Sequence, residues 1–274
     1  MNLRALLHLL GFKPAPARYG HDIATFELPA DGTVQLARWC HPHETPKVVE
    51  QRVIDHLRSF LQPGDVVLDI GAHSGDTAVP LALAVGPAGR VFAVEPNPYV
   101  FPVLVANSRL NRDKTAIVPL NFAVAAVAGP IEFSYSDAGF CNGGEHQGIS
   151  RWRHAHPFRL TVAGENLETH LSVHYPDTRG RVRFVKVDAE GADLAVLQSL
   201  AGLIERERPF IRAEVHKLMP PASRVELAAW LTARGYRLYR VADEAHYQGE
   251  PIGASDIDRW RQFDLFAVPG GRSD

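Results

Sequence analysis

The chain has 274 residues, of which 46% are hydrophobic and 22% are charged. That length and composition are typical of one large globular domain with a short addition. The formal net charge of −2 shows no basic excess, so neither a nucleic-acid partner nor an anionic membrane surface is expected.

Residues 1–46 are interpreted as an N-terminal lead segment that is mostly irregular. Residues 3–12 are apolar, but Arg4 and His8 interrupt them, which favours a short amphipathic helix over a secretory signal. Pro14, Pro16, Pro42 and Pro46 then punctuate the segment. We expect it to cap an acceptor site or to form a contact surface. The two cysteines, Cys40 and Cys141, form no CxxC unit, so a reducing, cytoplasmic compartment is expected.

Residues 47–274 alternate between two patterns of apolar residues. Continuous apolar runs are typical of strands covered on both faces, and apolar spacing of three to four residues is typical of helices. The first pattern predicts strands over 65–70, 90–94, 116–124, 130–135, 181–187, 210–215, 236–241 and 262–268. The second predicts helices over 46–60, 74–85, 98–111, 192–207 and 223–234. A polar loop over about 137–157 interrupts the alternation. Long polar loops of this kind often serve as a lid or an acceptor wall.

This alternation, with its short connections, predicts the α/β class. We expect a mostly parallel seven-stranded sheet with helices on both faces. The last two strands follow each other without a helix, which predicts a C-terminal antiparallel hairpin at the edge of the sheet. That ending is typical of Rossmann-like class I methyltransferases rather than of dinucleotide dehydrogenases.

The strongest motif is VVLDIGAHSG at residues 66–75. A buried strand there leads through Gly71 and Gly75 into a helix, and ligands of such sheets bind at the carboxyl ends of the strands. The two glycines allow the backbone to approach a ligand closely. Their G-x-x-x-G spacing differs from the G-x-G-x-x-G of dinucleotide sites, which disfavours a dehydrogenase, and no P-loop motif is present in the chain.

Glu95 ends the next predicted strand, 20 residues beyond Gly75. A carboxylate at that place can accept hydrogen bonds from both hydroxyls of a ribose, so a nucleoside site is expected. Asp69 is expected beside a methionine amino group, or else as a charge at the start of a helix. Asn97-Pro98-Tyr99 is similar to the NPPY element of DNA amino-methyltransferases, but it follows the second strand instead of the fourth, so it is interpreted as a turn.

Five segments together resemble the FkbM-type methyltransferases: VVLDIGAHSG, VFAVEPNP, NFAV, FVKVDAEGADLAVL and IRAEVH. The resemblance extends over about residues 49–241, and KVDAEG at 186–191 is similar to the family's K-[IV]-D-x-E-G signature. It implies S-adenosylmethionine as the cofactor and hydroxyls of secondary metabolites or glycans as acceptors. By this resemblance, Asp69, Gly71, Gly75, Glu95 and Asn97 are expected to bind the cofactor, and Ala123 is expected beside the adenine. Further candidate cofactor-binding residues are Ala72, His73, Ser74, Pro96 and Asp188. The family commonly has Asn at the position of His73, which leaves a side-chain contact at that position open.

Candidate catalytic residues follow two later strands. Asp188 and Glu190 follow one strand, Glu214 and His216 end the next, and adjacent parallel strands would place all four around one crevice. A hydroxyl acceptor needs a base, and neighbouring carboxylates raise the proton affinity of a histidine. We therefore expect His216 to take the acceptor proton, oriented by Glu214 or Asp188. Alternatively, Asp188 and Glu190 position the methionine part of the cofactor and the following helix.

A metal-assisted reaction is a related hypothesis. Asp188, Glu214 and His216 would suit Mg²⁺, but their spacing along the chain is not that of a metal motif, so no metal site is predicted. The predicted function is S-adenosylmethionine-dependent methyl transfer to a hydroxyl of a small molecule or sugar. A methyltransferase acting on nitrogen or on a protein, and a non-catalytic S-adenosylmethionine-binding protein, are the alternatives. No motif identifies the acceptor or the oligomeric state.

Overall fold

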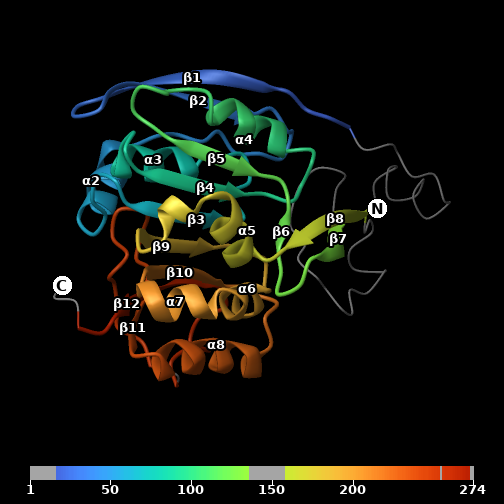
Figure 1. Ribbon diagram of the computed structural model, residues 1–274, viewed down its shortest axis with the longest axis vertical. Coiled ribbons are helices and arrows are strands. Elements are labelled where there is room, and N and C mark those ends of the chain that lie inside the picture. Colours follow the sequence, from blue (N-terminus) through green and yellow to red (C-terminus); the bar gives the residue numbers. More distant parts are fainter. Residues whose placement is uncertain (1–16, 136–157, 254, 272–274) are drawn as a thin grey trace.

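The central element is a seven-stranded sheet with the strand order β11-β12-β10-β9-β3-β4-β5 (Figure 1). We describe residues 17–135, 158–253 and 255–271 of a computed structural model. The strands of this sheet are β3 (Val66–Ile70), β4 (Arg90–Val94), β5 (Ile117–Leu120), β9 (Val182–Val187), β10 (Phe210–Val215), β11 (Tyr236–Arg240) and β12 (Phe263–Pro269).

Strand direction divides this sheet into two parts. The pairs β3–β4, β4–β5, β3–β9 and β9–β10 are parallel, whereas β12 is antiparallel to both β10 and β11. The sheet is therefore mixed, with the antiparallel pairing confined to the end where the chain finishes. The predicted terminal hairpin is present, and its last strand, β12, lies inside β11 instead of at the edge.

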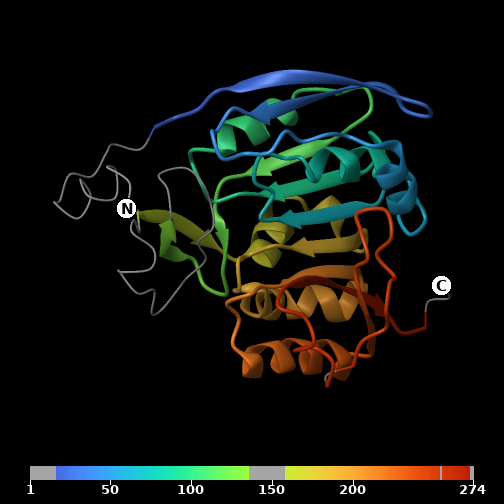
Figure 2. The same ribbon diagram turned by 180° about the vertical axis from the view of Figure 1, so that it is seen from behind.

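Helices cover both faces of the sheet, as the apolar runs predicted (Figures 1 and 2). All five residues of β3 are buried, with Leu68 in the core of one face and Val67 in the core of the other. The first face packs against α5 (Leu167–His174), α6 (Asp193–Ser199), α7 (Ala201–Glu207) and α8 (Pro221–Ala233). The second packs against α2 (Gln51–Arg58), α3 (Ala78–Val85) and α4 (Phe101–Asn107). Within the described residues, no helix combines the length and apolar character needed to cross a bilayer.

The N-terminal segment contains a β-hairpin that the sequence analysis did not predict. β1 (His21–Leu28) and β2 (Gly32–Trp39) pair antiparallel along their whole length. Val34 and Leu36 alternate inward along β2 and are buried, which is the period of a half-buried strand. The prediction of an irregular segment was therefore wrong over 21–39, because the prolines that suggested it flank the hairpin. The helix predicted over 3–12 lies outside the described residues.

A second sheet lies beyond the carboxyl ends of the parallel strands (Figure 1). It has the strand order β6-β8-β7 and consists of β6 (Ala123–Val124), β7 (Gly129–Tyr135) and β8 (Phe158–Glu165). The single strand predicted over 116–124 is thus divided between two sheets. β8, α5 and the 3-10 turn Pro176–Thr178 were not predicted. The helix predicted over 192–207 is two helices that meet at Leu200. The loop predicted over 137–157 lies outside the described residues.

Asn107, at the end of α4, ties the hairpin to the turn that follows β3. Its Oδ1 accepts the backbone N–H of Ala37 at 2.8 Å, and its Nδ2 donates to the carbonyls of Ala37 and Ser74 at 2.9 and 2.8 Å. Asn107 is fully buried. Water therefore cannot replace these bonds without rearrangement, and each group left unpaired in the interior costs free energy.

We expect Asn107→Ala to lower the free energy of unfolding by about 2–3 kcal/mol, because it leaves buried backbone groups of Ala37 and Ser74 without partners. Urea denaturation followed by circular dichroism measures this change. The matched control is Asn111→Gly, because Asn111 makes the analogous pair with Gln35 in an exposed place. Glycine suits its φ of +52°, and we expect a cost below about 1 kcal/mol. Equal losses in the two variants would contradict this account.

Candidate active site

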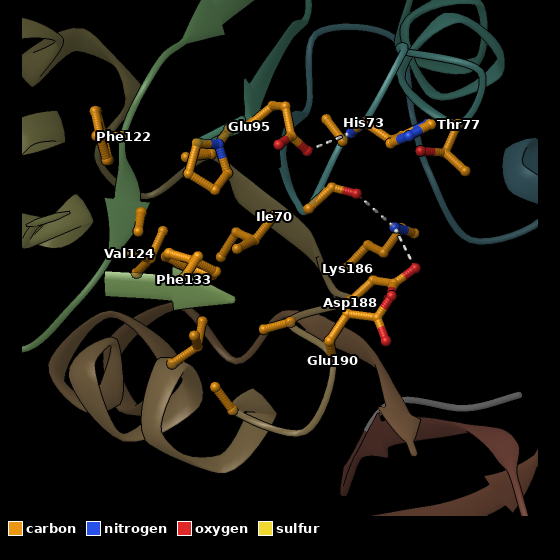
Figure 3. A pocket seen from close by; sticks show the side chains of 18 of the residues that line it. Ile70, His73, Thr77, Glu95, Phe122, Val124, Phe133, Lys186, Asp188 and Glu190 are labelled. Carbon is orange, nitrogen blue, oxygen red and sulfur yellow. Dashed lines mark hydrogen bonds and ion pairs between the residues drawn. The ribbon is translucent and has the colours of Figure 1, made fainter. Parts of the chain in front are cut away.

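A cavity of about 600 Å³ opens at the carboxyl ends of β3, β4 and β9. Its walls come from the turn after β3, the end of β4, the second sheet, the segment after β9 and residues 43–47. Figure 3 shows an apolar end with Phe122, Val124 and Phe133, and a polar end with Lys186, Asp188 and Glu190. The cavity thus offers an apolar slot and a charged recess within one space.

The turn after β3 brings backbone to within contact of the segment after β9. Gly71 has a φ of +78°, and a Cβ at this position would lie 2.0 Å from the carbonyl oxygen of Asp188. No side chain fits there. His73 also adopts a left-handed conformation, with a φ of +48°. Asn and His are among the residues that tolerate this region, so the substitution of His for the usual Asn preserves the backbone of the turn.

Glu95 ends β4 with its carboxylate fixed by two backbone donors. Oε2 accepts the N–H of His73 at 2.9 Å and Oε1 accepts the N–H of Asn97 at 2.7 Å. Burial raises the pKa of Glu95 above its ordinary value, while His73 and the two donors act in the opposite direction. Each carboxylate oxygen can accept a further hydrogen bond, so Glu95 presents two fixed acceptors at the wall of the cavity.

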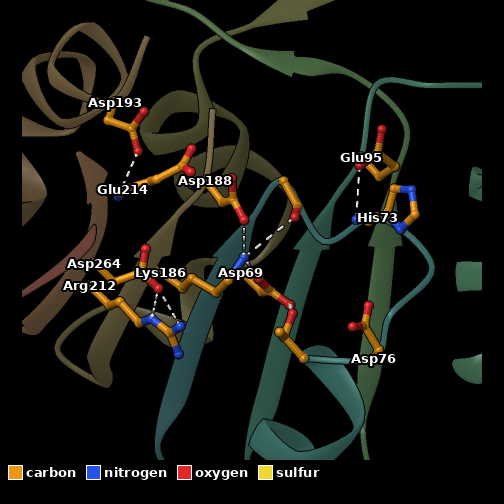
Figure 4. A network of polar contacts seen from close by, with 12 residues as sticks. Asp69, His73, Asp76, Glu95, Lys186, Asp188, Asp193, Arg212, Glu214 and Asp264 are labelled. Carbon is orange, nitrogen blue, oxygen red and sulfur yellow. Dashed lines mark hydrogen bonds and ion pairs between the residues drawn. The ribbon is translucent and has the colours of Figure 1, made fainter. Parts of the chain in front are cut away.

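Lys186, which lines the cavity, joins the ends of β3 and β9 (Figure 4). Its Nζ lies 3.4 Å from Oδ1 of Asp69 and 3.5 Å from Oδ2 of Asp188. Asp69 is fully buried, and its Oδ2 accepts the hydroxyl of Thr77 at 2.8 Å. Burial opposes the charge of Lys186, but the two carboxylates outweigh it and raise the pKa of the ammonium. The cation is therefore a fixed part of this end of the sheet.

Glu190, Glu214 and His216 form a cluster beside the charged recess. Nε2 of His216 lies 3.3 Å from Oε2 of Glu190, and Nδ1 of His216 accepts the N–H of Leu218 at 3.3 Å. A neutral imidazole that accepts at Nδ1 carries its proton on Nε2, so we assign His216 as a donor to Glu190. Gln262 donates to Oε1 of Glu214 at 2.5 Å.

The carboxylates of this cluster hold protons more tightly than free ones do. Burial, together with Glu214 and Asp188, raises the pKa of Glu190 to about 8. Burial, with Asp188 and Asp193, raises the pKa of Glu214 to about 7. Like charges held together in a poorly solvated place disfavour ionisation, so near neutral pH both the protonated and the ionised forms of these groups are populated. Groups with such values are suited to proton transfer.

The same cluster has the composition of a metal site. One ligand atom from each of Glu190, Glu214 and His216 lies within 4.8 Å of the others. Asp188, which the sequence analysis had grouped with Glu214 and His216, is instead paired with Lys186. The structure thus places Glu190 in the position that the metal hypothesis gave to Asp188.

The predicted site residues fall into two groups. Those that line the cavity are Gly71, Ala72, His73, Glu95, Pro96, Ala123, Asp188 and Glu190. The others, Asp69, Ser74, Gly75, Asn97, Glu214 and His216, are not among the residues that line it. Sequence reasoning missed Glu44, Lys47, Asp76, Thr77 and Lys186, which also line it. Lys186 belongs to the KVDAEG motif and could have been found there, whereas nothing in the sequence marks residues 43–47.

Comparison with known proteins identifies the family. A model of the Methyltransferase FkbM domain matches residues 69–238, which is more than half of the chain. The chain belongs to the FkbM methyltransferase family. No curated protein sequence matches it.

Three of the solved structures to which the chain is similar are methyltransferases or related proteins with low sequence identity. The methyltransferase FkbM from Methylobacillus flagellatus KT is 13% identical with a TM-score of 0.47, and the match covers 76% of this chain and 44% of that one. The present chain therefore spans less than half of that protein. Aeropyrum pernix fibrillarin, solved with natively bound S-adenosyl-L-methionine, is 14% identical over 92% and 98% of the two chains, with a TM-score of 0.43. A Thermotoga maritima SAM-dependent O-methyltransferase is 13% identical over 93% and 80%, with a TM-score of 0.41.

We expect Lys186→Met to lower the free energy of unfolding by about 3–5 kcal/mol, because it leaves the buried carboxylate of Asp69 without its cation. Urea denaturation at pH 7 measures the effect. The double variant Lys186→Met, Asp69→Asn removes both charges and should be more stable than Lys186→Met alone. A double variant that is less stable than the single one would show that the ion pair is not the source of the loss.

Proposed function

We propose that this FkbM family protein transfers the methyl group of S-adenosylmethionine to a hydroxyl of a small molecule or sugar. Membership of a methyltransferase family supports methyl transfer in general. The observation that carries the choice of cofactor is the arrangement of Glu95, whose two oxygens are each fixed by a backbone N–H at the wall of the cavity. Two fixed acceptors side by side match the two hydroxyls of a ribose.

The rest of the cavity fits the same cofactor. Gly71 has no side chain where one would collide with Asp188, which lets the turn at the cavity wall pack against the segment after β9. The apolar end, with Phe122, Val124 and Phe133, suits the faces of an adenine, and Ala123 lies in the same wall. The charged end suits an amino-acid group. S-adenosylmethionine, when bound, would supply a methyl carbon on positively charged sulfur: the acceptor oxygen would form a bond to that carbon as the C–S bond breaks, with S-adenosylhomocysteine as the leaving group.

We assign Glu190 as the base that takes the proton of the acceptor hydroxyl. Its carboxylate lines the cavity, whereas His216, which the sequence argument favoured for this role, is 3% exposed and is not among the residues that line it. Glu190 also holds a left-handed φ of +51°, and uncommon backbone conformations of this kind concentrate at functional sites. His216, whose Nε2 lies against this carboxylate, acts as a positioning residue. A base whose pKa lies near the working pH is partly ionised at that pH and still has enough proton affinity to take the proton.

We expect S-adenosylhomocysteine to bind the wild type and Glu95→Ala to weaken that binding about 10- to 100-fold, through lost charged hydrogen bonds. Isothermal titration calorimetry measures both affinities. Glu226→Ala, on the exposed side of α8, is the matched control and should leave the affinity unchanged. A wild type that binds neither S-adenosylmethionine nor S-adenosylhomocysteine would refute the proposed cofactor.

We expect methyl transfer to rise with pH as Glu190 loses its proton. The pKa of this group is raised to about 8, so below that pH it is mostly protonated and cannot accept a proton from the acceptor. A panel of alcohols, phenols and glycosides, assayed for S-adenosylhomocysteine release between pH 6 and 9, gives the profile.

Two variants test this assignment. Glu190→Gln should lower turnover about 10²- to 10⁴-fold across the range while cofactor binding persists. Glu214→Gln removes a neighbouring negative charge and should move the profile to lower pH. A wild-type profile in Glu190→Gln would reject Glu190 as the base. Cofactor binding without turnover of any acceptor, in the wild type, would favour the non-catalytic alternative.

A further inference from the structure

Residues 43–47 form a wall of the cavity although they precede the Rossmann-like part of the chain. They connect β2 to α2, and His43, Glu44, Thr45 and Lys47 all line the cavity. The family model begins at residue 69, so none of these residues belongs to the matched region. The N-terminal segment therefore contributes directly to the site.

Lys47 is the cation of this wall. Its Nζ lies 3.1 Å from Oδ2 of Asp76 and 3.3 Å from Oε1 of Glu44. Asp76 belongs to the turn between β3 and α3, and its Oδ1 accepts the hydroxyl of Ser74 at 3.1 Å. The three charged groups thus join the N-terminal segment to the turn that carries Gly71 and His73, and Asp76 appears beside His73 in Figure 4.

The charge of Lys47 is fixed at neutral pH. Burial acts against it, but Asp76 and Glu44 outweigh burial and raise the pKa of the ammonium. In return, Lys47 holds the pKa of Asp76 below its ordinary value despite the burial of that carboxyl. Lys47 and Asp76 are therefore both charged at neutral pH, and Lys47 presents a positive charge to the cavity.

Lys47 also has capacity for another anion. An ammonium has three N–H donors, and within the described residues Glu44 and Asp76 engage two of them. The side chain is 34% exposed, in contrast to Lys186, which is 8% exposed and enclosed by Asp69 and Asp188. The eight-residue helix α3 begins at Ala78, and the peptide dipoles at its start favour negative charge in the same place.

We propose that Lys47 binds the α-carboxylate at the amino-acid end of the cofactor. This inference rests on the proposed function, since it assigns one group of the proposed cofactor to one side chain. Glu44 and Asp76 then hold Lys47 in place, and the third N–H of the ammonium meets the ligand. The cofactor site is then completed by a residue of the connection between β2 and α2, which precedes the region that the family model matches.

Three nucleosides test the assignment by calorimetry. S-adenosylhomocysteine carries the complete amino-acid end, its decarboxylated analogue S-adenosyl-3-thiopropylamine lacks the carboxylate alone, and 5′-methylthioadenosine lacks the whole end. In the wild type we expect S-adenosylhomocysteine to bind about 10- to 100-fold tighter than the decarboxylated analogue, the range for a hydrogen bond between charged groups. In Lys47→Met the two affinities should be about equal, because the group that binds the carboxylate is gone.

The controls separate this assignment from a purely structural role of Lys47. Lys47→Arg keeps the charge and should keep most of the preference, and 5′-methylthioadenosine should bind Lys47→Met as it binds the wild type. Equal affinities of the wild type for S-adenosylhomocysteine and the decarboxylated analogue would overturn the inference, and so would an unchanged preference in Lys47→Met. If Lys47→Met does not fold, Lys47→Gln takes its place under the same criteria. A wild type that binds none of the three nucleosides would instead refute the proposed function itself.

Discussion

The ion pair that Lys186 makes with Asp69 and Asp188 is the interaction on which the site depends. Asp69 has no exposed surface, so its charge is stable in the interior only with a cation beside it. Lys186 supplies that cation and at the same time reaches Asp188, which lines the cavity. Because β3 and β9 are neighbours in the sheet, this ion pair helps to hold their carboxyl ends in register. The close contact of Gly71 with the carbonyl of Asp188 requires that alignment.

Around this ion pair, several segments of the chain form the walls of the cavity. The parallel strands supply the turn after β3 and the carboxylate of Glu95, while the second sheet supplies apolar residues and residues 43–47 supply charge. The strands are buried on both faces and tolerate little change, whereas the enclosing segments lie at the rim. In such an arrangement the sheet determines where a ligand binds, and the rim determines which acceptor can reach it.

The sequence predicted the parts of this structure that are governed by short-range pattern. Buried strands such as β3, which is apolar except for Asp69, are recognisable as apolar runs. The turn with Gly71 and the acidic end of β4 at Glu95 follow from spacing along the chain. The β1–β2 hairpin was missed because its outer strand is largely exposed and carries little apolar periodicity. Lys47 was missed for a different reason: it reaches Asp76 only through tertiary folding, and no local motif marks such a contact.

The separate roles of Glu190 and His216 also depend on tertiary folding and could not be predicted from spacing alone. Spacing placed both residues near one crevice, but which of them faces it depends on the backbone of Glu190 and on the partner of Nδ1 in His216.

A base and a metal ligand make opposite demands on Glu190. A divalent cation held by Glu190, Glu214 and His216 would offset the repulsion between the carboxylates, lower their proton affinity and leave Glu190 a poor base. Burial and the nearby charges of Glu214 and Asp188 raise the pKa of Glu190 to about 8. Glu190 can therefore act as a base only if no cation offsets the repulsion between these carboxylates. The crowding of carboxylates at this end of the sheet, which costs stability, is therefore the physical source of the basicity that the proposed reaction requires.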